Sequence, residues 1–169
     1  VIGDIGCYSL AAVPPLSSMD TCISMGASIG IAQGLELALG NKMKQKIVAV
    51  IGDSTFVHSG ITPLLNVVYN KGATLVIILD NQTTAMTGGQ NHPGTGVNLK
   101  GEKTSKLNYE YLIRALGIKK IAIIDSYNLK ESEEVIRREL GCGRPSVIIA
   151  RNPCVLIAKK KDKLFRINT

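Results

Sequence analysis

Residues 47–90 read IVAVIGDSTFVHSGITPLLNVVYNKGATLVIILDNQTTAMTGGQ, and this stretch sets the fold. Residues 47–51 and 75–79 are short apolar runs rich in β-branched side chains, which predict buried parallel strands. Between them we expect a helix with Thr62 as its N-cap, Pro63 at its first position and Gly72 just past its end. Such a strand–helix–strand unit brings the carboxyl ends of both strands to one edge of the sheet.

Polar side chains follow both predicted strands. Asp53 comes directly after the first strand and Asn81 after the second. Open α/β sheets bind ligands at this edge. Carboxylate and amide oxygens suit Mg²⁺, with phosphate oxygens and water completing the coordination. A magnesium–phosphate site is therefore expected there, and an ordinary strand–helix–strand unit with polar strand ends is the alternative.

The remainder of the chain continues the alternation of strands and helices. We predict helices over residues 26–39, 108–116 and 129–140, strands over 118–124 and 146–150, and strand ends at 1–3 and 19–23. Asn108 and Asn128 are expected to cap their helices. The pattern predicts an α/β three-layer sandwich with a mostly parallel sheet, in which residues 1–169 form one domain.

Three further segments carry structural predictions. Gly26, Gly30 and Gly34 lie one helical turn apart, and we expect them to allow close approach of another backbone. Residues 88–103 form a long loop rich in Gly and Asn, which is expected to fold over a bound ligand. Residues 155–157 are apolar and are expected to pack against the domain.

Composition excludes several classes of function. The chain has 169 residues and a net charge of +7, much of it within residues 151–169, which we interpret as a solvated edge or packing tail. The few aromatic residues and the lack of a known module argue against a nucleic-acid partner. No apolar run is long enough to span a bilayer, and the start does not resemble a signal peptide, so a cytoplasmic location without membrane contact is expected. The four cysteines form no C-x-x-C pair, which argues against zinc or iron–sulfur sites in this chain and predicts reduced, mostly buried thiols.

The residues Gly52-Asp53-Ser54, followed by Asn81, resemble the GDG…NN signature of thiamine-diphosphate enzymes. Ser54 stands where the signature has its last Gly, and Asp80 stands where it has its first Asn. The resemblance implies thiamine diphosphate and Mg²⁺ as cofactors. It also implies that Asp53, Asn81 and the carbonyl oxygen of Thr83 hold the metal ion on the diphosphate.

A longer resemblance covers most of the chain. Its segments are GDIGCYSL (3–10), PPL (14–16), DTCISMGASIG (20–30), VIGDSTFVHSGI (50–61), LLNVVYN (64–70), LDNQTTAMTGGQNHPGTG (79–96) and RNPCVLIAKKK (151–161). Together they look like the diphosphate-binding domain of indolepyruvate ferredoxin oxidoreductase alpha subunits. The resemblance implies oxidative decarboxylation of aryl pyruvates with coenzyme A, with electrons passing to ferredoxin. It further implies a chain truncated at both ends, a beta-subunit partner, a possible homodimer, and [4Fe-4S] clusters only in the full-length subunit.

The same resemblance assigns the residues around the cofactor. Met25 would be the bulky side chain over which the cofactor bends, and the carbonyl of Ile23 would accept its 4′-amino group; a core methionine is the alternative for Met25. Besides the three metal ligands, the expected cofactor-binding residues are Gly6, Cys7, Tyr8, Ile23, Met25, Gly26, Gly52 and Ser54.

His58 is the histidine nearest the acidic loop. It is a candidate acid/base or a group that steers the substrate carboxylate, and a histidine hydrogen-bonded under the helix start is the alternative. His92 is expected to make a loop contact. No glutamate matches the one that protonates the cofactor pyrimidine in this superfamily, so we expect no turnover by the chain alone. Another thiamine enzyme, such as a different 2-oxoacid oxidoreductase or a decarboxylase, and a non-enzymatic Rossmann-like interaction domain remain alternatives.

Overall fold

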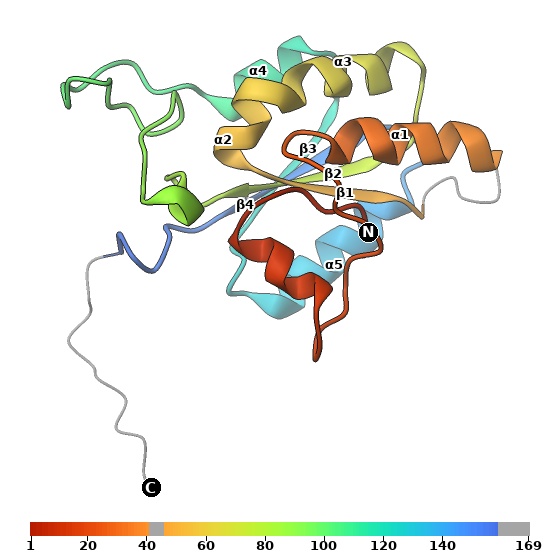
Figure 1. Ribbon diagram of the computed structural model, residues 1–169. Helices are drawn as coiled ribbons and strands as arrows, with labels where there is room; N and C mark the ends of the chain where they lie inside the picture. The colour runs from red at the N-terminus through yellow and green to blue at the C-terminus, as the bar shows by residue number, and fades with distance from the viewer. Residues whose placement is uncertain (41–45, 159–169) are drawn as a thin grey trace, which may run out of the picture.

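A computed structural model describes residues 1–40 and 46–158 (Figure 1). The predicted helix stop at Asn41 and the basic residues 159–166 lie outside the described residues. The described chain contains a sheet of four strands in the order β1-β2-β4-β3, and every pair is parallel. Its strands are β1 (Val48–Gly52), β2 (Leu75–Asp80), β3 (Lys120–Ile124) and β4 (Ser146–Arg151). Ile2 bridges both Ala49 and Thr21, which confirms the two predicted strand ends as single bridges beside β1.

Helices cover both faces of the sheet, as Figure 1 shows. On one face lie α1 (Ser28–Leu39), α3 (Ile61–Tyr69) and α4 (Tyr109–Ala115); on the other lie α5 (Leu129–Leu140) and the short 3-10 helix η1 (Cys7–Ala12). The buried side chains fall into two clusters, because successive strand residues point to opposite faces. Ile149 belongs to the cluster under α1, α3 and α4, and its neighbour Ile148 to the cluster under α5. The predicted three-layer α/β sandwich is confirmed.

Local capping signals place two helices where the sequence predicts them. The Asn108 side chain accepts a hydrogen bond from the backbone N–H of Tyr111 and begins α4. The Asn128 side chain accepts from the backbone N–H of Glu131 and begins α5. Each asparagine thereby pairs a backbone donor that the first helical turn leaves free.

The helix after β1 begins at Asp53, well before the predicted start at Pro63. A turn of α-helix, α2 (Asp53–Thr55), runs through a wide π turn, η3 (Phe56–Gly60), directly into α3. Thr62 therefore does not cap a helix, and Pro63 lies inside one. Proline has no N–H to donate to the preceding turn, and here the wider turn comes just before it.

The end of α3 also differs by one residue from the prediction. Lys71 takes the left-handed conformation, with φ of 54°, and Gly72 follows it. The N–H of Lys71 donates to Val68 and that of Gly72 to Val67, which is the paired pattern of a Schellman ending. Gly72 thus occupies the position after the one expected.

Three other structural predictions are wrong in whole or in part. A Cβ added to Gly30 or Gly34 would meet no atom of another segment within 4 Å, so neither glycine makes the expected close contact. Gly26 precedes α1 and does allow a close approach, since a Cβ there would lie 2.3 Å from Ser59 Cβ. Residues 155–157 are exposed rather than packed. The four cysteines are free thiols as expected, but none is buried, and Cys7 is exposed.

In the part of the chain that the structure describes, no helix has the length and hydropathy needed to traverse a bilayer.

Candidate functional site

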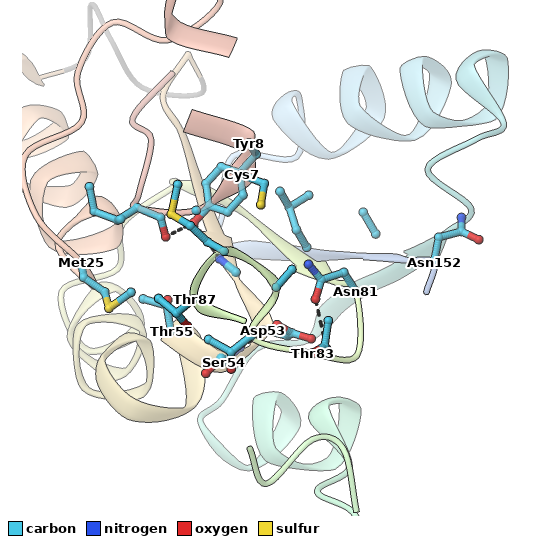
Figure 2. A pocket seen from close by; sticks show the side chains of 18 of the residues that line it. Cys7, Tyr8, Met25, Asp53, Ser54, Thr55, Asn81, Thr83, Thr87 and Asn152 are labelled. Atoms are coloured by element: carbon cyan, nitrogen blue, oxygen red, sulfur yellow. Dashed lines mark hydrogen bonds between the residues drawn. The ribbon is translucent and has the colours of Figure 1, made fainter. Parts of the chain in front are cut away.

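A cavity of about 310 Å³ opens at the carboxyl edge of β1, β2 and β4 (Figure 2). Its walls come from the loop before η1 and the first residues of η1, the start of α2, the loop after β2 and the segment after β4. The lining residues are Ile5, Gly6, Cys7, Tyr8, Met25, Gly52, Asp53, Ser54, Thr55, Leu79, Asn81, Thr83, Thr84, Ala85, Met86, Thr87, Ser126, Ala150 and Asn152. Most of the predicted cofactor-binding residues therefore share one cavity.

Asp53 occupies the point where the ends of β1 and β2 meet. The residue is only 2% exposed. Oδ1 accepts a hydrogen bond of 2.7 Å from the N–H of Ser54, and Oδ2 accepts one of 2.8 Å from the N–H of Gln82. The second bond joins the loops that follow the two strands, so the predicted proximity of Asp53 and Asn81 is confirmed.

The loop after β2 is shaped by Asn81 itself. Asn81 Oδ1 accepts from the N–H of Thr83 at 3.1 Å, drawn as a dashed line in Figure 2. Gln82 takes a left-handed conformation with φ of 64°. Asparagine side chains commonly stabilise such turns by bonding to the backbone two residues ahead. This turn holds the Asn81 amide and Thr83 at the cavity wall.

The predicted ligand oxygens suit a hard divalent cation. Each side-chain oxygen of Asp53 and Asn81 accepts one backbone hydrogen bond, and a carboxylate or amide oxygen has a second lone pair. Among residues 1–40 and 46–158, no group of three or more His, Cys, Asp or Glu side chains could hold a metal. A cation here would need phosphate and water oxygens, which is the coordination that Mg²⁺ adopts on phosphates.

Tyr8 forms the opposite wall. Its Oη accepts a hydrogen bond of 3.0 Å from the N–H of Gly52. Burial, followed by the negative charge of Asp4, raises the pKa of Tyr8, so the phenol is neutral. A Cβ on Gly6 would lie 2.4 Å from the Tyr8 ring, so glycine leaves the room that this ring occupies. Gly6 and Cys7 extend the same wall.

Met25 lines the cavity and is 46% exposed, so it is not the core methionine considered as an alternative. Gly26 follows it in a left-handed conformation with φ of 85°, and a Cβ there would lie 2.3 Å from Ser59 Cβ. Neither Gly26 nor Ile23 lines the cavity, and the Ile23 side chain is exposed.

The position of Met25 depends on Asp4, which the sequence analysis did not single out. Asp4 is fully buried. Its Oδ1 accepts from the N–H of Gly26 at 2.8 Å and its Oδ2 from that of Ser28 at 3.2 Å. The carboxylate thus caps α1 and fixes the loop that carries Met25.

The two histidines lie at different distances from the cavity than the sequence suggests. His58 is exposed, lies outside the cavity lining, and pairs through Nδ1 with Ser59 Oγ at 2.5 Å. The structure therefore does not bring His58 to this cavity, because the early start of the helix places it on the wide turn η3. His92 is 8% exposed, and its Nε2 lies 3.4 Å from Asp53 Oδ2. His92 makes the expected loop contact, because its Nδ1 accepts from the N–H of Gly94, and through Nε2 it also brings the long loop to Asp53.

A charged cluster supports the strand ends from outside the cavity. Arg151 Nε donates to Asp80 Oδ2 at 2.6 Å, and its Nη1 donates to Glu110 Oε1 at 3.0 Å. Burial opposes ionisation of Glu110, but its backbone hydrogen bond and the Arg151 guanidinium outweigh that effect and lower its pKa. Asp80 does not line the cavity, in agreement with its exclusion from the predicted ligands.

Comparison with known proteins identifies relatives of this fold and sequence. Residues 4–150 match the model of the family described as "Thiamine pyrophosphate enzyme, C-terminal TPP binding domain". The chain is 45% identical over 154 residues to the indolepyruvate oxidoreductase subunit IorA of Archaeoglobus fulgidus, covering 91% of this chain and 24% of that subunit. It is 46% identical over 153 residues to the IorA subunit of Methanothermobacter marburgensis, covering 90% and 24%.

Among solved structures, the 2-oxoglutarate:ferredoxin oxidoreductase of Magnetococcus marinus aligns with a TM-score of 0.75 at 16% identity. The alignment covers 90% of this chain and 53% of that one, and at this identity it supports the fold alone. The chain spans about a quarter of the length of the two curated IorA subunits.

Proposed function

Since this chain belongs to the family of C-terminal TPP-binding domains of thiamine pyrophosphate enzymes, we propose that it holds thiamine diphosphate (TPP) through Mg²⁺. Asp53, Asn81 and the carbonyl oxygen of Thr83 would be the protein ligands of the ion. The observation that carries this proposal is the hydrogen bond from the Gln82 N–H to Asp53 Oδ2, since it draws the loops after β1 and β2 together.

The other cavity residues would bind and orient the cofactor. Cys7 and Tyr8 lie across the cavity from Asp53 in Figure 2. With Gly6, and with Gly52 and Ser54 at the start of α2, they would line the diphosphate. Met25 would support the bent cofactor, and the carbonyl of Ile23 would accept its amino group. Bound thiamine diphosphate supplies the nucleophilic carbon that attacks the 2-oxo group of a substrate. The residues named here would orient the cofactor toward the incoming substrate and shield the diphosphate from bulk water.

We further propose that the chain is the diphosphate-binding domain of an aryl-pyruvate ferredoxin oxidoreductase. Its reaction would convert indolepyruvate or a similar 2-oxoacid and coenzyme A to acyl-CoA and CO₂, with two electrons passing to ferredoxin. The proposal is supported by 45% identity to a named IorA subunit. A beta subunit, a possible homodimer, [4Fe-4S] clusters elsewhere in a longer subunit and a cytoplasmic location belong to the same proposal.

Calorimetry with thiamine diphosphate tests the cofactor assignment, using the protein produced from its full reading frame. We expect binding heat in the presence of Mg²⁺ and its loss after chelation with EDTA. Binding that is absent, or unaffected by Mg²⁺, would refute the assignment and favour a non-enzymatic interaction domain.

Reduction of a viologen dye tests the substrate class in the same protein with its beta subunit. We expect dye reduction that requires both indolepyruvate and coenzyme A. If another 2-oxoacid supports reduction and indolepyruvate does not, the aryl-pyruvate proposal is wrong while the cofactor assignment stands.

A further inference from the structure

The long loop over residues 88–103 reaches the candidate metal site through the buried side chain of His92. Among residues 1–40 and 46–158, the buried His92 Nε2 has no hydrogen-bond partner, and it lies 3.4 Å from Asp53 Oδ2. Ordinary N–H···O bonds measure about 2.7–3.2 Å, so this contact is slightly long. Buried polar atoms are nearly always hydrogen-bonded. The buried Asp53 carboxylate is therefore the partner toward which the imidazole ring is oriented.

The loop itself determines which ring nitrogen carries the proton. The N–H of Gly94 donates to His92 Nδ1 at 3.2 Å, so Nδ1 is the acceptor. In a neutral imidazole the other nitrogen then bears the hydrogen. His92 Nε2 is therefore a donor aimed at Asp53.

The ring is held on its other sides. A Cβ at Gly94 would lie 2.2 Å from Tyr109 Oη and 2.8 Å from His92 Cε1, so the turn, the tyrosine and the imidazole pack closely. Tyr109 is 1% exposed, lies against Phe56 and donates to the backbone oxygen of Asp53 at 3.4 Å. These contacts leave the imidazole little freedom to turn away from the carboxylate.

We propose that His92 is a positioning residue, which orients the Asp53 carboxylate through its Nε2–H. The inference rests on the proposed function, in which Asp53 holds the cation of the cofactor. Oδ2 of Asp53 lies between the Gln82 N–H and His92, and Oδ1 is held by the Ser54 N–H. The carboxylate is thus oriented by two backbone donors and one side chain that arrives from the long loop. Hydrogen-bond partners of metal ligands commonly control metal affinity in this way.

Three variants of the full-length protein test this role by calorimetry with thiamine diphosphate and Mg²⁺. His92→Leu removes the donor, His92→Gln keeps an N–H near the same place, and Asn91→Gln changes the exposed neighbour. We expect His92→Leu to weaken Mg²⁺-dependent binding by about 10–100-fold, and His92→Gln to recover most of that loss. Asn91→Gln should bind as the wild type does. Leucine binding as the wild type, or glutamine binding as poorly as leucine, would overturn the proposal.

A second measurement needs no cofactor and separates this inference from the proposed function. Nitrogen-15 NMR of the histidine side chains should show the Nε2–H tautomer for His92, and the Nε2 signal should shift in Asp53→Asn. Failure of the wild type to bind thiamine diphosphate would refute the proposed function, and the NMR result would still decide whether His92 contacts Asp53. An Nε2 signal that ignores the Asp53 substitution would overturn the inference.

Discussion

Asp53→Asn gives the sharpest test of the site. Asp53 is 2% exposed and carries the single negative charge in the predicted ligand set of Asp53, Asn81 and Thr83. The substitution removes that charge and keeps the size of the side chain. It also places an NH₂ group where one carboxylate oxygen now accepts a backbone hydrogen bond, from either Ser54 or Gln82.

Both effects have an expected size. Removing the hydrogen-bond partner of a metal ligand lowers metal affinity by about 10–100-fold. Removing the charged ligand itself should therefore cost at least about 100-fold in affinity, or about 2.7 kcal/mol. The mismatched amide should also lower the free energy of unfolding without cofactor by about 1–3 kcal/mol, since one buried backbone donor then loses its charged acceptor. Affinity must therefore be measured at a temperature where the variant is still folded.

Asp80→Asn is the matched control. Asp80 is as buried as Asp53 and ends the neighbouring strand, but it binds Arg151 and does not line the cavity. We expect it to lose stability without losing Mg²⁺-dependent affinity for thiamine diphosphate, measured by calorimetry beside a thermal melt. Unchanged affinity in Asp53→Asn, or an equal loss in Asp80→Asn, would refute the ligand assignment.

Four further variants test local structure. Burial raises the pKa of Tyr8, so the neutral phenol stabilises the folded protein fully below pH 10, and this stabilisation is lost as the pH rises above that value. The urea midpoint of unfolding should therefore fall above pH 10, and Tyr8→Phe should reduce the fall. Asn128→Ala should lower the free energy of unfolding by about 1 kcal/mol in urea, and an unchanged value would contradict the observed cap. Gly94→Ala should cost about 1–3 kcal/mol because its Cβ would meet Tyr109 Oη at 2.2 Å. Gly34→Ala, where a Cβ meets open space inside α1, should instead stabilise the protein by about 0.5–1 kcal/mol, and thermal melts of the two variants should shift in opposite directions.

The fold was predictable because its signals are local. Each strand is a short apolar run, and the parallel order of the sheet follows from the helices between them. Asn108 and Asn128 begin helices through bonds to residues three positions ahead. The meeting of Asp53 and Asn81 also follows from topology, since the ends of adjacent parallel strands share an edge.

The helix predicted to start at Thr62-Pro63 begins at Asp53 instead, which shows where local signals fail. Thr62-Pro63 has the composition of an N-terminus, and nothing in its immediate neighbours reveals that helical turns already precede it. Phe56 is fully buried and packs against Tyr109, with ring centroids 6.3 Å apart. This contact joins residues far apart in sequence and fixes Phe56, which lies between Asp53 and Pro63, in the core. Tertiary packing therefore outweighs the capping preference at Thr62.

The residues that hold the site in place were harder to foresee than the residues that form it. Asp4 binds the N–H of Gly26, and His92 faces Asp53. Both side chains come from loop segments, where no hydrophobic periodicity exists to predict their contacts. Their buried polar atoms must find partners wherever the chain brings donors and acceptors together, because an unpaired buried group is costly. A family motif can point to Asp53 and Asn81, but only coordinates reveal which distant side chains keep them oriented. Substitutions at Asp4 and His92 therefore test the residues that hold the cavity in place, independently of the residues that form it.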